Sequence, residues 1–158
     1  MKLTIDTAEY IIAFDPATVT GYAYQTAGPL IYGATRFAEQ SWRAIAQTAY
    51  EQGARYAVVE DAFLGSNAKV YGMLKAIQGE LVAGLISIGY QPVLIKPAEW
   101  KTELFGARTI GKELAVQYAI EQTGAVKIGH DAADAICLLR YAERVRLFAA
   151  VHNERTEA

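Results

Sequence analysis

The segment YIIAFDPATVTGYAY, residues 10–24, predicts a β-hairpin with an acidic residue at its rim. An apolar, strand-forming run leads up to Asp15. Pro16 has no N–H to donate to a sheet, so the strand is expected to end at the acid. A turn built on Pro16 and Gly21 then leads into a second strand-like run. A carboxylate here is costly unless it is solvated, paired or bound to a cation, so Asp15 is either a turn-capping residue or a metal ligand.

The rest of the chain predicts an α/β fold. Residues 19–25 and 30–37 have strand-forming composition and, with the first strand, predict an antiparallel meander. Two later apolar runs, residues 56–61 and 91–95, alternate with segments in which apolar residues recur at helical spacing. These predicted helices lie between residues 41 and 53, 67 and 89, 97 and 104, 111 and 123, and 130 and about 151. We therefore expect a mixed five-stranded sheet, three antiparallel strands followed by two parallel ones, with helices on both faces.

Length and composition predict a single domain. The chain has 158 residues, of which 53% are hydrophobic and 20% charged, and we expect one domain with its core at about residues 10–150. No signal peptide or membrane-spanning run is visible, which predicts a cytoplasmic protein without a membrane partner. Cys137 is the only cysteine, which excludes an internal disulfide and a cysteine-based zinc site and predicts a buried apolar filler. Residues 153–158 form a polar tail that we expect to fray.

The charge balance leaves the binding partner open. A net charge of −2 argues against a protein that coats nucleic acid nonspecifically, because such proteins need excess Lys and Arg. If four of the 17 acidic residues bind metal, however, 13 acids remain against 15 basic residues, a slight positive excess.

Four acids carry the expected chemistry: Asp15 and Glu60 at the ends of two strands, and Asp131 and Asp134 at the start of the last helix. Residues three positions apart share a helix face, so Asp131 and Asp134 are able to point at one spot. Their alternative role is to stabilise the N-terminus of the helix through its dipole. Asp134 is followed by the apolar residues 135–139, which indicates a helix entering the core, where an acid needs a cation.

Four oxygen ligands from separate elements suit Mg²⁺, or Mn²⁺ in its place, because these ions prefer carboxylates and water over His or Cys. Two such ions about 4 Å apart clamp the attacking and departing oxygens of a phosphodiester. We therefore expect two Mg²⁺ ions per active site and no small-molecule organic cofactor.

Three short motifs resemble those of a known family. They are Phe14-Asp15-Pro16 with Thr20-Gly21-Tyr22, then VEDAF at residues 59–63, and DAADA at residues 131–135. In this order and spacing the chain resembles the RuvC-type Holliday-junction resolvases of the ribonuclease-H-like nuclease superfamily, from about residue 10 to 142. The resemblance implies a ribonuclease-H-like fold. It also implies that Asp15, Glu60, Asp131 and Asp134 hold two divalent metals that activate water to hydrolyse a DNA strand.

The resemblance also implies three DNA-binding residues. Lys101 and Lys112 match positions at which the family places lysines beside the scissile strand, and both lie near a loop or helix start suited to phosphate. The alternative is that they are solvated surface lysines. Phe63 matches an aromatic residue that stacks on or wedges between bases at the junction centre, although loop phenylalanines also fold back onto a core.

Two residues stand out against this pattern. Ala17 occupies a position where the family usually has glycine, so the turn is expected to differ slightly. His130, directly before Asp131, either assists proton transfer or a metal, or is a solvent-exposed neighbour of the helix start. The short, mildly charged chain fits a phage or viral member of the family, acting in a bacterial or phage-infected cell.

The sequence therefore predicts a structure-selective endonuclease that binds four-way DNA junctions. A homodimer would nick two strands symmetrically. The broad apolar stripe of the helix at residues 70–88 is either a dimer surface or the sign of a helix buried deep in one core. The alternatives are a related nuclease that acts on RNA, a junction-binding protein without catalysis, and a phosphotransferase of the actin and sugar-kinase superfamily. That last class requires two such domains around ATP.

Overall fold

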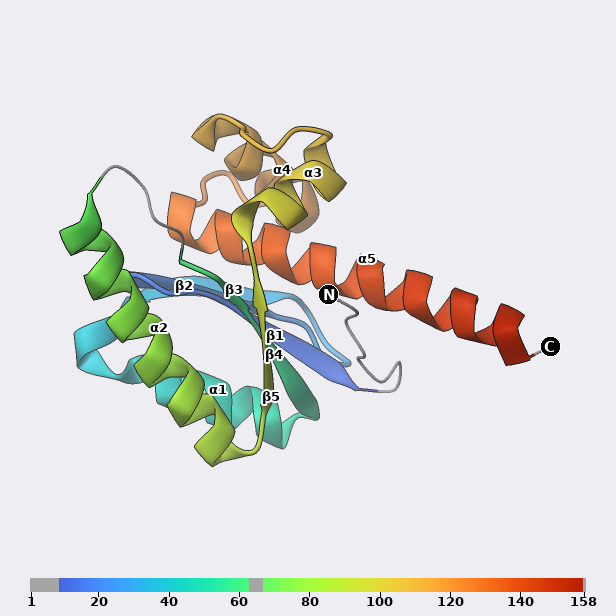
Figure 1. Cartoon of the computed structure of the whole chain (residues 1–158), viewed down its shortest axis with the longest axis horizontal. Coiled ribbons are helices and arrows are strands. Elements are labelled where there is room, and N and C mark those ends of the chain that lie inside the picture. The colour runs from blue at the N-terminus through green and yellow to red at the C-terminus, as the bar shows by residue number, and fades with distance from the viewer. Residues whose placement is uncertain (1–8, 63–66, 158) are drawn as a thin grey trace.

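A five-stranded mixed sheet forms the centre of the molecule (Figure 1). The computed structural model describes residues 9–62 and 67–157, with side chains described as far as residue 146. The strands are β1 (Tyr10–Asp15), β2 (Val19–Tyr24), β3 (Ile31–Arg36), β4 (Ala54–Glu60) and β5 (Gln91–Ile95), in the spatial order β3-β2-β1-β4-β5. β1, β2 and β3 pair antiparallel, whereas β4 is parallel to β1 and β5 is parallel to β4.

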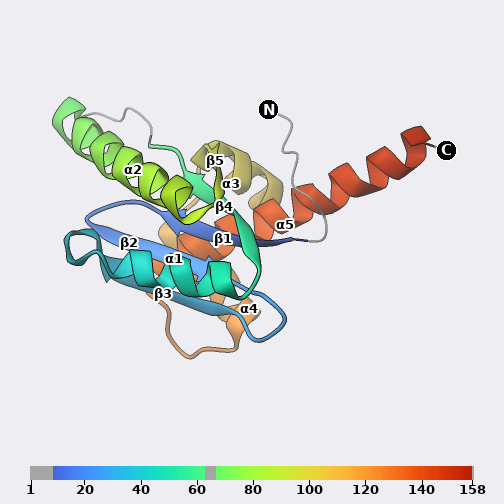
Figure 2. The ribbon, with the colours of Figure 1, turned by 90° about the horizontal axis from the view of Figure 1, so that it is seen from below.

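Helices cover both faces of this sheet (Figures 1 and 2). They are α1 (Ser41–Glu51), α2 (Ala68–Ile88), α3 (Pro97–Phe105), α4 (Lys112–Thr123) and α5 (His130–Glu157), with a 3-10 helix at Phe37–Glu39. α1 and α2 pack on one face, and α3, α4 and α5 pack on the other. The predicted α/β fold, a mixed five-stranded sheet with three antiparallel and two parallel strands and helices on both faces, is confirmed.

The sheet separates two apolar cores, and β1 contributes to both. Its side chains alternate, so Ile11 and Ala13 pack toward α5 while Ile12 and Phe14 pack toward α1 and α2. All four are at most 2% exposed. Burial of a side chain such as Phe14 stabilises the fold by about 1.5–3 kcal/mol, so the strand that carries Asp15 is held firmly on both sides.

The turn between β1 and β2 is held by a buried threonine. The Thr20 hydroxyl is fully buried and donates a hydrogen bond to the Ala17 carbonyl oxygen at 2.8 Å. Ala17, which stands where the family usually has glycine, does not have a positive φ, so this turn accepts a side chain at that position.

Helix ends agree with the sequence at several points and differ at two. Asn67 caps α2, because its side-chain oxygen accepts from the backbone N–H of Lys69 and Val70 at 3.0 and 3.2 Å, and Gly89 follows the helix with φ 125°. The sequence did not predict the 3-10 helix after β3. In this helix, the buried ring of Phe37 stacks on Trp42, with ring centroids 5.9 Å apart. The expected end of the last helix at about residue 151 was wrong, because α5 continues to Glu157 through residues without Gly or Pro.

Cys137 is fully buried, as predicted for an apolar filler. Over the described parts of the chain, none of the helices combines the length and the apolar character that crossing a membrane requires.

Candidate metal centre

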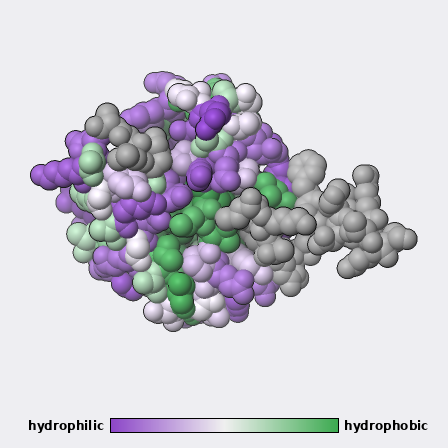
Figure 3. Space-filling model, viewed as in Figure 1, coloured by the Kyte–Doolittle hydropathy of each residue, from purple (hydrophilic) through white to green (hydrophobic). Residues whose placement is uncertain are grey.

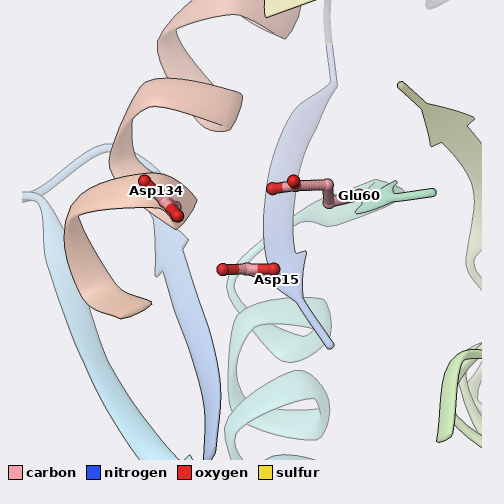
Figure 4. A group of neighbouring side chains, drawn as sticks. All are labelled: Asp15, Glu60 and Asp134. Atoms are coloured by element: carbon pink, nitrogen blue, oxygen red, sulfur yellow. The ribbon is translucent and has the colours of Figure 1, made fainter. Parts of the chain in front are cut away.

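Three carboxylates from distant parts of the chain meet at the carboxyl ends of the inner strands β1 and β4 (Figure 4). Phe14 pairs with Val59 in the parallel ladder of β1 and β4, so the next residues, Asp15 and Glu60, end the two strands side by side. Asp134 comes from the first turns of α5. One carboxylate oxygen from each of the three lies within 4.8 Å of the others.

Asp131, the fourth acid singled out in the sequence, lies outside this group of three. It is half-buried and sits one helical turn before Asp134. Its charge nevertheless raises the pKa of both Asp15 and Asp134, so it contributes to the same negative region. The structure thus brings three of the four acids within ligand distance and leaves Asp131 at their margin.

Burial and mutual repulsion make the ionised forms of these acids unfavourable. Burial first, and then the charges of Asp134 and Asp131, raise the pKa of Asp15 to about 7. Burial, with the charge of Asp131, raises the pKa of Asp134 to about 6. The pKa of Glu60 lies well above its usual value because of burial, Asp15 and Asp134. The site therefore retains protons near neutral pH unless a cation compensates the charges.

Basic residues surround the acids. Lys101, half-buried in α3, lowers the pKa of all three acids through its positive charge. Lys112 is the exposed first residue of α4, and it lowers the pKa of Asp134. His130 begins α5, is exposed, and has the same effect on Asp134. Phe63 lies outside the described residues.

The donor set fits a hard divalent cation. The group contains only carboxylate oxygens, the ligands that Mg²⁺ and Mn²⁺ prefer. One of its oxygens, Glu60 Oε2, is buried and has no hydrogen-bond partner among the described residues. A buried charged acceptor without a partner is costly, and a bound cation would satisfy it.

Trp100 is a neighbour of the site that the sequence did not single out. Its side chain is fully buried in the core beneath α5, and its indole Nε1 also lacks a partner that meets hydrogen-bond geometry within the described chain. The indole N–H interacts with Glu60, however, and lowers the pKa of that carboxyl group. Trp100 thus presents a donor to an acid that has an unsatisfied oxygen. The only available signal in the sequence was its position next to Lys101.

Gly21 determines how closely α5 approaches the sheet. It pairs with Asp15 in the β1–β2 ladder, and a Cβ atom at this position would overlap the carbonyl oxygen of Asp131. Only glycine lets the start of α5 lie directly against β2 here. The signal was present in the sequence as Thr20-Gly21-Tyr22, but it was interpreted there as part of a turn.

Solved structures that share this arrangement of strands and helices are Holliday junction resolvases. Thermus thermophilus RuvC is similar with a TM-score of 0.67 and 17% sequence identity, covering 87% of this chain and 96% of that one. The fold is that of the RuvC resolvases. T. thermophilus RuvC in complex with a Holliday junction substrate gives a TM-score of 0.70 at 16% identity, with coverage of 88% of this chain and 96% of that chain.

A viral structure has the same fold. Fowlpox virus resolvase, in complex with substrate Holliday junction DNA, gives a TM-score of 0.52 at 14% identity and covers 85% of this chain and 98% of that one. No protein-family model matches the sequence, and no curated protein matches it either. At these identities the likeness establishes the fold, and the roles of individual residues rest on the geometry of the site.

The raised pKa values predict a stability that falls with pH when no metal is bound. From its ordinary value of 3.8 up to about 7, Asp15 holds its proton more tightly in the folded chain than in the unfolded chain, and Asp134 does so up to about 6. The unfolding free energy therefore decreases as pH rises through this range. We expect the melting temperature in EDTA to drop by several degrees between pH 5 and 8, and Mn²⁺ to reverse the drop. A pH-independent melting temperature in EDTA would contradict this.

Replacing Trp100 is expected to weaken metal binding. Trp100→Phe removes the donor that faces Glu60, and loss of such a supporting hydrogen bond typically costs roughly 10- to 100-fold in metal affinity. The matched control is Trp42→Phe, because Trp42 is also fully buried with an unpartnered indole N–H but lies in the other core. Mn²⁺ titrations followed by tryptophan fluorescence should show a change in Trp42→Phe and none in Trp100→Phe. Equal Mn²⁺ affinities, measured by calorimetry, would show that Trp100 does not support the site.

Gly21→Ala is expected to displace the start of α5. The overlap with Asp131 should lower the unfolding free energy by about 1–3 kcal/mol and reduce Mn²⁺ affinity. The control is Gly28→Ala, because a Cβ atom at Gly28 meets nothing within 4 Å. Denaturant unfolding and calorimetry measure the two effects, and wild-type values for Gly21→Ala would refute the close approach.

Proposed function

We propose that this protein is a metal-dependent endonuclease that resolves four-way DNA junctions. The observation that carries the proposal is the convergence of Asp15, Glu60 and Asp134 at one sheet edge, in a fold shared with Holliday junction resolvases. Acids brought together in this way raise one another's pKa, which is a cost to the fold that a functional site explains.

The acids are the proposed ligands of the catalytic metal. Asp15, Glu60 and Asp134 would hold the ions, and Asp131 would complete the set after a small movement of its side chain. When bound, two Mg²⁺ ions supply Lewis-acid stabilisation of the phosphodiester and lower the pKa of the attacking water. The fully buried residues on either side of the strand ends hold the acids in place and limit access of bulk water.

Lysines are the proposed contacts to the scissile strand. Lys101 lies beside all three acids, so its ammonium group would neutralise a non-bridging oxygen of the phosphate next to them. Lys112 begins α4, where backbone N–H groups add to the positive potential that a phosphate meets. Phe63 retains its proposed role at the junction centre, on the basis of its position three residues after Glu60.

Two copies of the chain would cut the two strands of a junction symmetrically. The first half of α2 supports this arrangement, because Val70 and Met73 lie one helical turn apart and are 45% and 47% exposed. Further apolar surface lies over β5, which forms one edge of the sheet (Figure 3). Exposed apolar side chains that gather on one side of a molecule are typical of an association surface.

The decisive test incubates a synthetic four-way junction with the protein and Mg²⁺. Asp15→Asn and Glu60→Gln should each reduce the cleavage rate by roughly 100- to 1,000-fold while leaving junction binding intact. Glu51→Gln, an exposed acid at the end of α1, is the control and should cleave normally. Full cleavage by either variant would refute the role given to these acids. Faster cleavage of an RNA junction than a DNA junction would indicate the RNA-directed alternative.

The dimer is tested separately. Met73→Glu places a charge in the proposed interface and should convert a dimer to a monomer in sedimentation experiments, with junctions then nicked on one strand at a time. Glu121→Lys changes an exposed charge on α4, on the other face of the sheet, and should leave the dimer intact. A wild-type protein that sediments as a monomer on junction DNA would refute symmetric cleavage by a dimer.

A further inference from the structure

A recess lies next to the metal centre. It has a volume of about 560 Å³ and is lined by Asp61, Ala62, Tyr71, Lys75, Lys96, Pro97, Ala98, Lys101, Arg108 and Thr109. We call it the side cavity. Four of its lining residues are basic and one is acidic, in a chain whose net charge is −2. Positive charge is therefore concentrated at this site rather than spread over the surface.

The floor of the side cavity is fixed by hydrogen bonds. Directly after Glu60, the backbone N–H of Asp61 donates to the Ile95 carbonyl oxygen at 2.8 Å. The next N–H, of Ala62, donates to the side chain of Gln78 at 2.8 Å, and Gln78 is only 6% exposed. The cavity is thus built on the same strand end that presents Glu60 to the metal centre, and the two sites keep a fixed relation.

The acid in the side cavity is already neutralised. Asp61 forms an ion pair with Lys75, in which Oδ1 and Nζ are 2.6 Å apart. The same Lys75 Nζ lies 5.7 Å from the centre of the Tyr71 ring. Over the described residues, no acidic side chain lies within ion-pair distance of Lys96, Lys101 or Arg108. Lys96 and Arg108 therefore remain available for an anionic ligand, beside the aromatic ring of Tyr71, whereas the charge of Lys101 also acts on the acids of the metal centre.

Size and charge together favour one nucleotide. Small-ligand pockets have volumes of about 300–1,000 Å³, and a DNA duplex is far too wide to enter such a recess. Tyr71, Pro97 and Ala98 offer an apolar wall for a base, and Lys96 and Arg108 suit its phosphates. Lys101 joins the two sites, since it lines the side cavity and also lowers the pKa of the metal-centre acids.

We propose that the side cavity binds one unpaired nucleotide of the cleaved DNA strand, next to the scissile phosphate, with Tyr71 against its base and Lys96 and Arg108 on its phosphates. This inference rests on the proposed nuclease function. It also supplies a physical basis for structure selectivity: a nucleotide enters the cavity only where base pairing is already lost, as at the crossing point of a branched molecule. In a fully paired duplex, the nucleotide must first be unpaired, and the free energy of unpairing makes cleavage less favourable.

The first test measures binding without cleavage. A short fluorescein-labelled single-stranded DNA is titrated in EDTA, with anisotropy as the readout. Lys96→Ala/Arg108→Ala should weaken binding roughly tenfold or more and reduce the slope of log affinity against log salt by about 1.4, since each single-strand phosphate contact contributes about 0.7. Lys96→Arg/Arg108→Lys keeps the charges and should bind normally. Arg36→Ala, an exposed arginine on the strand at the other edge of the sheet, controls for loss of charge.

The second test locates the nucleotide. Junctions carrying a single abasic nucleotide, moved one position at a time along the cleaved strand, are assayed with wild-type protein and with Tyr71→Ala. At one position, the abasic nucleotide should reduce cleavage by the wild-type protein but have little further effect on cleavage by Tyr71→Ala. This is expected because the missing base and the Tyr71 ring contact each other.

The outcomes separate the two proposals. Unchanged single-strand affinity in Lys96→Ala/Arg108→Ala overturns the side-cavity proposal, whether or not junctions are cleaved. Additive effects of Tyr71→Ala and every abasic position would also overturn it, even if junction cleavage by the wild type upholds the nuclease. A wild type that binds the oligonucleotide through Lys96 and Arg108 but never cleaves a junction supports the cavity and refutes the nuclease.

Discussion

The parallel pairing of β1 with β4 is the constraint on which the site depends. Because the two strands are parallel and in register, their carboxyl ends lie side by side, which brings the carboxylates of Asp15 and Glu60 together. The first turns of α5 lie against these strand ends and add Asp134. The resulting repulsion is visible in the raised pKa of all three groups, and the surrounding structure opposes it through Lys101 and the indole of Trp100. The repulsion between these carboxylates is therefore relieved either by protonation or by a bound cation.

Local patterns in the sequence were sufficient for most of the fold. Period-two alternation in β1, an acid at the end of each of two apolar runs, and the Asn67 cap of α2 each have a local cause. The division into three antiparallel and two parallel strands also followed, because short connections join antiparallel neighbours and helical crossovers join parallel ones. Asp15 and Glu60 were foreseen as neighbours for the same reason.

Features that arise from packing between distant segments were not accessible to this reasoning. Helical spacing placed Asp131 and Asp134 on one face but did not reveal that the first lies at the margin of the acid group. The contact of Gly21 with α5 depends on the angle of a helix that starts more than a hundred residues later in the sequence. The side cavity joins the residues that follow β4 with α2, α3 and the loop after α3, and no pattern within one segment predicts it.

The two cores have unequal bearing on catalysis. The core beneath α5 fixes Asp134 and Trp100 directly, whereas the core under α1 and α2 reaches the acids only through the strands of the sheet. β1 and β4 contribute side chains to both cores, so a substitution under α1 and α2 would reach Asp15 and Glu60 through the backbone of these two strands. A change in the core beneath α5 would instead move Asp134 relative to the two strand-end acids.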